Sequence, residues 1–516
     1  MTDISDIQEE TSTYDAVRSD TLSASLLLLV VAQVLQRSVG LGRNILFCGL
    51  LTDEQLGRWS LAFNFLMLAA PLVVLGLPGS FGRYVEHYRQ RGQLRSFLLR
   101  TGGVTLLAML GATALLLAYP RSIANFVYGN PEQVHVVHVL GFSLAAVIVF
   151  NFLVELFTAM RLVRFASSLQ LVSSVGFAVV GVSLLYLTDY REIAIVLAYG
   201  TASLIAVVIG LWLLLRSWNS LSQSSTPLAH HTMWFKLLPF AGWIWATNLI
   251  GNLFEYADQF MLKHFSGLSA SAADALIGQY YSSRMIPVLL IALATMVGNS
   301  LLPHLSRDWE AGRRDAVKGR LQLAVKLTAL SFTLAAGIVL LAAPLLFAWA
   351  LGGRYATGMS VMPGTLAYCV WFCLTGMAMS YLLCAEAAHL GSVALFCGLA
   401  ANVGLNYLLA PRYGLPGVVS ATIAANAVAF FFVVWLSRRR GMKWDRGLYW
   451  SAFLPLSLLL GGGPSIAIVT VVIFAAWQSN WIFNSEESGQ LAECRNYLFE
   501  KLPWTWPVNR PGLKEA

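Results

Sequence analysis

Charged residues are scarce in this sequence. Only 12% of its 516 residues are Asp, Glu, Lys or Arg, whereas 57% are hydrophobic and the mean hydropathy is +0.66. Soluble domains typically contain roughly 25% charged residues, so this composition excludes a water-soluble globular chain. It predicts an all-α polytopic membrane protein, because spanning helices satisfy their own backbone hydrogen bonds in lipid.

Several motifs are also missing. No G-x-x-x-x-G-K-[ST] loop is present, which argues against direct use of ATP. The six cysteines follow neither a disulfide nor a zinc spacing. Long external loops with catalytic carboxylates or histidines are lacking, so we expect no enzyme, no cofactor and no metal. The first 21 residues carry neither a basic n-region nor a cleavage site, so we expect no signal peptide.

Apolar runs long enough to cross about 30 Å of hydrocarbon are abundant. They begin near residues 23, 60, 101, 134, 168, 193, 237, 278, 321, 361, 391, 415 and 450, and Gly461-Gly462-Gly463-Pro464 interrupts the last one. This predicts twelve spans and a thirteenth that crosses once or turns back. Lys and Arg concentrate in alternate connections, which predicts that the N-terminus lies on the cytoplasmic side. We expect the protein to lie in the cytoplasmic membrane. The same asymmetry explains the net charge of +8 without a nucleic-acid partner.

The two halves of the chain resemble one another at an offset of about 221 to 223 residues. Leu56-Gly57-Arg58-Trp59 matches Ile277-Gly278-Gln279-Tyr280, and Phe126-Val127-Tyr128-Gly129 matches Trp349-Ala350-Leu351-Gly352. Because six spans are an even number, the repeat predicts two six-helix lobes with the same membrane orientation. The expected segments are a cytoplasmic tail (1–21), an N-lobe (22–216), a linker (217–236), a C-lobe (237–437), a basic cytoplasmic loop (438–448), a thirteenth span (449–477) and a C-terminal tail (478–516).

Two arginines interrupt the first apolar run. Arg37 and Arg43 each cost about 2.5 to 3.5 kcal/mol at the centre of a membrane helix on insertion scales. With a helical advance of about 100° per residue, they share one face with Gln33, Gln36 and Asn44. This polar stripe predicts a wet cavity that suits an anionic substrate. Alternatively, Arg43 reaches the interface or pairs with a carboxylate of another helix.

The seventh run carries a second polar stripe. Asn248, Asn252, Glu255 and Gln259 share one face, and Asp258 lies at its edge. Carboxylates within the membrane are costly and usually face partners or water. We therefore expect Glu255 to carry a coupling proton or cation, with Asn252 and Asp258 as further candidates for this site.

These carboxylates also have a structural interpretation. Glu255 then forms a salt bridge with Arg37, Arg284 or Lys326, and Asp258 is exposed near the outer surface. Lys326 follows a basic loop by about one helical turn, so its side chain is expected to reach the interface.

Three motifs resemble a known family. They are Arg37-Ser38-Val39-Gly40-Leu41-Gly42-Arg43 in the first span, Tyr281-Ser282-Ser283-Arg284 in the eighth, and Leu301-Leu302-Pro303-His304-Leu305-Ser306-Arg307 at the inner end of the eighth. Over roughly residues 22 to 440 the chain resembles the multidrug/oligosaccharidyl-lipid/polysaccharide (MOP) exporter superfamily, and within it the polysaccharide-unit and lipid II flippases.

The resemblance implies a function and a site. Arg37, Arg43 and Arg284 are the implied pyrophosphate-facing groups, since lipid II flippases place arginines of the first and eighth helices in a central cavity. The implied activity is translocation of a polyprenyl-pyrophosphate-linked oligosaccharide for cell-surface polysaccharide biosynthesis, alongside polysaccharide polymerase or export machinery. Lipid II flippases have two further well-formed helices, whereas this chain has one interrupted run, which favours a capsule, exopolysaccharide or O-antigen unit.

Two other functions remain open. A cation-coupled multidrug or small-molecule exporter of the same fold would favour acidic and aromatic residues in the N-lobe cavity, where this chain has arginines. A membrane glycan polymerase or ligase would need a large extramembrane loop.

Overall fold

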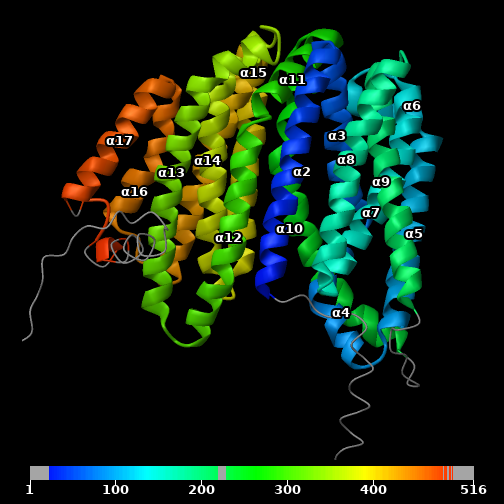
Figure 1. Ribbon diagram of the computed structural model, residues 1–516, viewed down its shortest axis with the longest axis horizontal. Helices are drawn as coiled ribbons and strands as arrows, with labels where there is room; N and C mark the ends of the chain where they lie inside the picture. The colour runs from blue at the N-terminus through cyan, green and yellow to red at the C-terminus, as the bar shows by residue number, and fades with distance from the viewer. Residues whose placement is uncertain (1–21, 219–227, 480, 485–486, 490, 492–516) are drawn as a thin grey trace, which may run out of the picture. The chain divides into compact units, whose positions relative to one another are not determined.

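The structure is a computed structural model that describes residues 22–218, 228–479, 481–484, 487–489 and 491. Regular structure in this part of the chain is helical throughout (Figure 1). The elements are α2 (Leu22–Leu50), α3 (Asp53–Val73), η2 (Pro78–Ser80), α4 (Phe81–Gln90), α5 (Leu94–Ala118), α6 (Pro120–Tyr128), α7 (Val134–Ala159), α8 (Val163–Leu187), α9 (Arg191–Arg216), α10 (His230–Phe265), α11 (Ala270–Arg284), α12 (Pro287–Glu310), α13 (Arg314–Trp349), α14 (Ala356–Cys384), α15 (Ala388–Arg439), α16 (Arg446–Phe453), η4 (Leu454–Leu460) and α17 (Gly462–Gln478).

The predicted spans coincide with these helices. Each of the predicted starting positions lies inside a helix. Within the described residues, nine helices are long and apolar enough to cross a membrane. The 52 residues of α15 hold two predicted spans, and Gly414 divides them with φ 56° and ψ −132°. Glycine has no Cβ that would oppose a positive φ, so it permits this break. The all-α fold class is confirmed.

The helices form two compact units. The first unit contains the described residues up to Ile286 together with Leu345–Val361 and Leu395–Thr422. The second contains Pro287–Pro344, Met362–Ala394 and the described residues from Ile423 onward. The expected lobe boundaries remain predictions. The tail 1–21, residues 219–227 of the linker and most of the tail 478–516 lie outside the described residues.

Helices α3 and α11 position much of the first unit's polar chemistry. Thr52 caps α3, because its hydroxyl accepts from the Gln55 amide at 3.3 Å and the Gln55 side chain accepts from the Thr52 amide at 3.1 Å. Ser269 caps α11 by accepting from the Ala272 amide at 3.4 Å. Such caps satisfy amides that lack a partner in the first helical turn.

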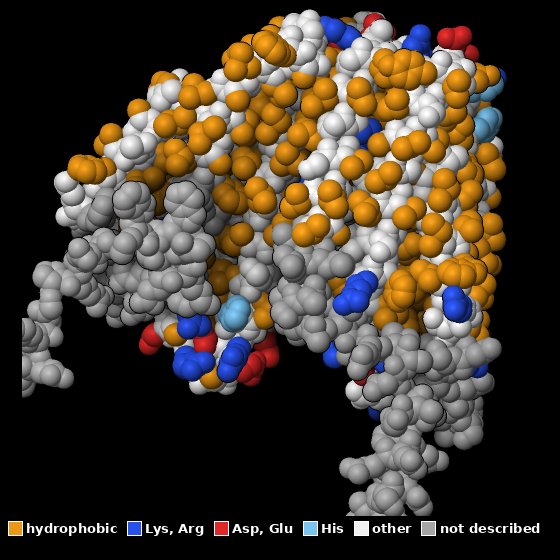
Figure 2. Space-filling model, viewed as in Figure 1, with side chains coloured by type: hydrophobic (Ala, Val, Ile, Leu, Met, Phe, Trp, Pro, Cys, Tyr) orange, Lys and Arg blue, Asp and Glu red, His pale blue; other side chains and the backbone are white. Residues whose placement is uncertain are grey.

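The outer flank of the first unit is apolar. Helix α5 exposes Leu99, Leu107 and Leu115, each by more than half of its surface. Hydrophobic side chains are also prominent on the visible face of this unit (Figure 2). An apolar surface of this extent is stable in lipid and not in water. Helices α7 and α9 are more than half buried and form the interior of this unit.

In the second unit, Lys326 differs from its expected position. Its side chain is completely buried, and its ammonium group contacts the carboxylates of Asp445 and Glu487 and donates to the Ile482 carbonyl at 2.7 Å. The expectation that it reaches the interface is wrong, because Asp445, just before α16, and Ile482 and Glu487, which follow α17, supply partners. A single sequence position cannot reveal partners more than 100 residues away.

The predicted thirteenth span is interrupted, as the glycine cluster suggested. Helix α16 continues into the 3₁₀ segment η4, which is capped by Gly461 with a φ of 99°, and α17 follows with 17 residues. At about 1.5 Å per residue such a helix is slightly shorter than the hydrocarbon layer. Whether this segment crosses once or turns back remains a prediction.

Candidate functional site

The polar stripe of α2 does not behave as one uniform surface. Arg43 is partly buried, and its guanidinium lies 4.1 Å from the centre of the Phe177 ring and donates to the Asn44 side chain at 3.1 Å. A cation over an aromatic face is stabilised electrostatically. Arg43 also lies close enough to the phenols of Tyr199 and Tyr281 to interact with them electrostatically.

Arg37 is exposed and forms no hydrogen bond or ion pair with any described residue. It lies six residues before Arg43, which is about 9 Å along the helix axis. Gln33 and Gln36 are half-buried, and the Gln36 carbonyl accepts from the Ser174 hydroxyl at 3.4 Å. Only Arg37 of the two α2 arginines therefore has its whole hydrogen-bonding capacity available for a ligand.

Arg284 lies at the end of α11 and is buried. Its guanidinium is 3.7 Å from the Glu255 carboxylate and 3.5 Å from the Glu255 carbonyl. Of the three salt-bridge partners expected for Glu255, the structure places Arg284 beside it.

Tyrosines connect the two arginine environments. Tyr256 lies near Arg284, Glu255 and Tyr199, and Tyr199 in turn lies near Arg43. The structure thus brings Arg43 and Arg284, which lie far apart in the sequence, into one tyrosine-lined environment within the first unit.

Asp258 is 1% exposed and is the centre of a buried polar cluster. Its carboxylate accepts from the side-chain amides of Asn402 and Asn406 at 2.9 Å each, from the Thr422 hydroxyl at 2.6 Å and from the Tyr280 hydroxyl at 3.2 Å. The alternative that Asp258 is exposed near the outer surface is wrong. Three of its four donors come from the two parts of α15 and the fourth, Tyr280, comes from α11, which sequence periodicity alone could not identify.

The Asp258 cluster contains no positively charged side chain among the described residues. A buried carboxylate is strongly disfavoured unless it is paired, protonated or fully hydrogen-bonded. The Asn406 carbonyl oxygen is also buried, and it has no hydrogen-bond partner within the described part of the chain. Several side-chain oxygens thus converge on this point. Asn252, the other residue expected near this site, is half-buried.

Helices α3 and α11 meet in a contact that reflects the internal repeat. A Cβ on Gly57 would lie 1.9 Å from the Asp274 carbonyl oxygen, and a Cβ on Gly278 would lie 2.1 Å from the Asp53 carbonyl oxygen. Gly57 matches Gly278, and Asp53 matches Asp274, at the offset of the repeat. The two halves of the chain therefore touch through equivalent backbone positions, and only glycine permits this distance.

Side chains strengthen this contact in the same symmetric way. Arg58 donates to the Asp274 carboxylate at 3.3 Å, and Gln279, its equivalent in the repeat, donates to the Asp53 carboxylate. We call these four residues together with Gly57 and Gly278 the α3–α11 clasp.

Three further side chains extend the clasp. Glu192 accepts from Arg58 at 2.9 Å, Lys263 contacts the Asp274 carboxylate, and Arg354 donates to Asp53 at 2.9 Å. Arg354 also donates to the Leu51 carbonyl at 2.8 Å, at the end of α2.

Sequence reasoning missed the role of these charges. Nothing in the sequence around Arg58, Lys263 and Arg354 indicated these contacts, although the repeat already aligned Gly57 with Gly278. The equivalence of Asp53 and Asp274 in that alignment is the signal that would have revealed the clasp.

Comparisons with known proteins agree with this architecture. The family model described as "Polysaccharide biosynthesis protein" matches residues 22–309, which is more than half of the chain. No curated protein sequence matches.

Solved structures show the same fold. The inward closed conformation of the lipid II flippase MurJ is 13% identical, with a TM-score of 0.67, and the match covers 88% of this chain and 100% of that chain. An inward-facing multidrug resistance MATE family transporter of the MOP superfamily is 13% identical, with a TM-score of 0.64 and coverage of 80% and 98%. A MOP superfamily transporter from Pyrococcus furiosus is 14% identical, with a TM-score of 0.58 and coverage of 81% and 94%.

At these identities the structural matches show the fold, while the family model shows the family. The expected two-lobed, all-α membrane architecture is the one that MurJ and the MATE transporters share. This chain belongs to the polysaccharide biosynthesis protein family.

Proposed function

We propose that this protein flips a polyprenyl-pyrophosphate-linked oligosaccharide across the cytoplasmic membrane for cell-surface polysaccharide biosynthesis. The observation that carries the proposal is the meeting of Arg43 and Arg284 in one tyrosine-lined environment, with Arg37 exposed on the same helix as Arg43. Guanidinium groups form paired hydrogen bonds with phosphate oxygens. Gln33, Gln36 and Asn44 complete the substrate site that we propose.

Alternating access of two lobes then moves the anionic part of the substrate, while the polyprenyl tail stays in lipid. Closure of the α3–α11 clasp seals one end of the path. The N-terminus is cytoplasmic in this proposal, and a polysaccharide polymerase or export complex receives the product.

Arg37→Ala tests the substrate site. We expect at least a tenfold loss of transport with normal membrane insertion, because the variant loses a phosphate contact while an expensive charge leaves the membrane helix. Arg37→Lys is expected to recover part of the activity, since an ammonium group lacks the planar fork. Transport is measured in proteoliposomes as the arrival of a fluorescent lipid-linked oligosaccharide in the opposite leaflet. Normal transport by the alanine variant at normal expression contradicts the proposal.

We further propose that Asp258 holds the coupling cation. Glu255 already has Arg284 as a partner, whereas the Asp258 carboxylate has four neutral donors and contacts no positively charged side chain of the described residues. A flip of an asparagine side chain exchanges its amide nitrogen and oxygen. Asn402 and Asn406 can therefore present oxygens either to a protonated Asp258 carboxyl or to an alkali cation bound beside it. Oxygen ligands are those that hard cations prefer.

Two isosteric variants separate the carboxylates. Asp258→Asn is expected to remove the dependence of transport on an imposed cation gradient, whereas Glu255→Gln is expected to keep that dependence and to lower the thermal stability. Transport is measured with Na⁺, K⁺ and proton gradients in turn. Loss of the gradient dependence in Glu255→Gln alone would assign the coupling to Glu255 instead.

The same cluster also suits a cation-coupled exporter of small molecules. The two functions differ in substrate, so purified protein is assayed with both a lipid-linked oligosaccharide and a panel of cationic drugs. Gradient-driven drug transport without movement of the lipid-linked substrate favours the exporter.

A further inference from the structure

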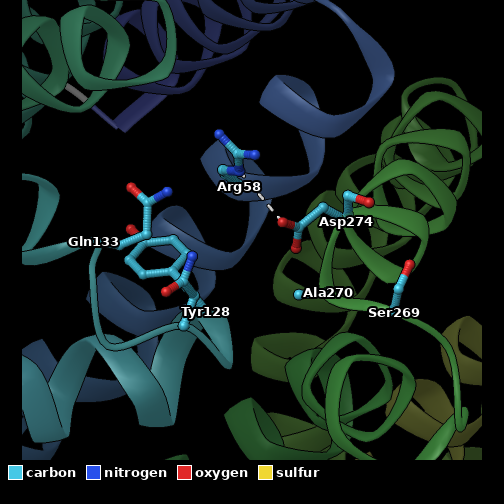
Figure 3. A pocket seen from close by; sticks show the side chains of 8 residues that line it. Arg58, Tyr128, Gln133, Ser269, Ala270 and Asp274 are labelled. Atoms are coloured by element: carbon cyan, nitrogen blue, oxygen red, sulfur yellow. Dashed lines mark hydrogen bonds and ion pairs between the residues drawn. The ribbon is translucent and has the colours of Figure 1, made fainter.

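A polar cavity of about 320 Å³ opens beside the clasp. Tyr128 and Gln133 line it from one side, and Ser269 and Ala270 line it from the start of α11 (Figure 3). Asn130 and Ser271 also belong to its wall. Its volume is at the lower end of the range of roughly 300–1,000 Å³ found for small-molecule sites. The tyrosine-lined arginine environment uses none of these residues.

The positive charges around the cavity are all paired. Arg58 and Asp274 form part of its wall; Arg58 is held by Glu192 and, at 3.5 Å, by Glu54, while Asp274 is held by Lys263. Two cations and three carboxylates thus leave no positive charge here for an anionic ligand. The remaining polar groups of the wall are neutral amides and hydroxyls, which do not favour an ionic ligand over its hydration in water.

The hydroxyl of Tyr128 has no hydrogen-bond partner among the described residues, although this side chain is only 1% exposed. Burial raises the pKa of the Tyr128 phenol, and the nearby carboxylates of Glu192 and Asp274 raise it further. The phenol therefore remains a neutral group that both donates and accepts. A buried hydroxyl without a partner is unfavourable by about 1–3 kcal/mol, and a ligand hydroxyl that comes within hydrogen-bond distance of it would remove that penalty.

We propose that this cavity binds one neutral sugar unit of a glycan. Sugar hydroxyls donate and accept hydrogen bonds, which matches a wall of amides, hydroxyls and one phenol. This inference rests on the proposed function only where it names the lipid-linked oligosaccharide as the source of the sugar. The binding site itself is argued from the residues of the cavity.

Binding here is linked to the clasp. Arg58 and Asp274 belong to the cavity wall and to the α3–α11 clasp, so the cavity has this form only while the clasp is closed. A sugar that binds the closed form shifts the population toward closure.

The test uses the full-length protein in nanodiscs and saturation-transfer NMR. The probes are methyl glycosides of glucose, galactose, mannose and N-acetylglucosamine, with methyl glucuronide as one charged comparison and inorganic pyrophosphate, followed by ³¹P line broadening, as the other. We expect at least one neutral glycoside to bind. Tyr128→Phe and Gln133→Ala are each expected to weaken it about three- to tenfold, which corresponds to the loss of one neutral hydrogen bond.

Tyr186→Phe is the matched control, because Tyr186 is 72% exposed on α8 and lies outside the cavity wall. Tyr128→Phe is expected to unfold no earlier than the wild type, since it removes an unpaired buried hydroxyl. Absence of glycoside binding overturns the proposal, as does binding that Tyr128→Phe and Gln133→Ala leave unchanged. Preferential binding of pyrophosphate in this cavity also overturns it.

The outcome is independent of the flipping assay. A wild-type protein that binds a glycoside but moves no lipid-linked oligosaccharide supports the cavity and contradicts the proposed function. A protein that flips its lipid-linked substrate but binds no glycoside supports the proposed function and contradicts the sugar site in the cavity.

Discussion

Replacing Gly57 by alanine is expected to abolish transport while leaving the protein folded. The new Cβ would lie 1.9 Å from the Asp274 carbonyl oxygen, whereas ordinary contacts begin at 3.4 Å. Helices α3 and α11 must then separate by about 1.5 Å, so the clasp cannot close. Alanine is also a better helix former than glycine by about 1 kcal/mol, which helps to keep α3 intact.

The internal repeat makes a second variant a strict test of this reasoning. Gly278→Ala meets the Asp53 carbonyl oxygen in the equivalent contact, so it is expected to show the same defect. Gly111→Ala on α5 is the control, because a Cβ there meets nothing within 4 Å. Normal transport in both clasp variants would show that closure of this contact is not required.

Spin labels report the separation directly. Glu54 and Ser271 are exposed or nearly so at the starts of the two helices, and the distance between labels at these positions is measured by pulsed electron paramagnetic resonance. We expect a longer distance in Gly57→Ala and Gly278→Ala than in Gly111→Ala. Equal distances in all three would contradict the steric argument.

Asp274→Asn is expected to lower the free energy of unfolding by about 3–5 kcal/mol, the typical result of removing one partner from a buried ion pair. The Lys263 side chain is 1% exposed and that of Asp274 is 5% exposed. Without the carboxylate, the ammonium group stays buried without a counter-charge. Chemical denaturation in detergent measures the change.

Asp53→Asn is the matched control, because Asp53 occupies the equivalent position of the other half. The Asp53 and Arg354 side chains are 28% and 39% exposed, so this pair is screened by water and its loss is expected to cost less than about 1 kcal/mol. Adding Lys263→Met to Asp274→Asn is expected to restore much of the stability, since it removes the stranded charge. If Asp274→Asn and Asp53→Asn lower the free energy of unfolding by similar amounts, the greater burial of the Asp274 ion pair does not make it more important for stability.

Local patterns determined much of this protein. Apolar runs of sufficient length predicted helices that the structure contains, and the spacing of Arg37, Arg43 and the neighbouring polar residues placed them on one face of α2. These features depend on hydrophobicity and on the helical period, which act over a few residues. The internal repeat was likewise visible in the sequence, because duplicated segments keep equivalent residues at a constant offset.

Only the tertiary structure decided which side chains meet. Asp258 and its donors Asn402, Asn406 and Thr422 are more than 140 residues apart in the chain, and Arg58 and Asp274 are separated by 216 residues. The free energy of burying a charged side chain depends on its partners and on the hydration that it loses. Neither can be read from the sequence of one helix. The sequence alone therefore determined the helices, the repeat and the candidate arginines, whereas packing between distant helices decided which charges are neutralised, which carboxylate has only neutral donors among the described residues and where the α3–α11 clasp closes.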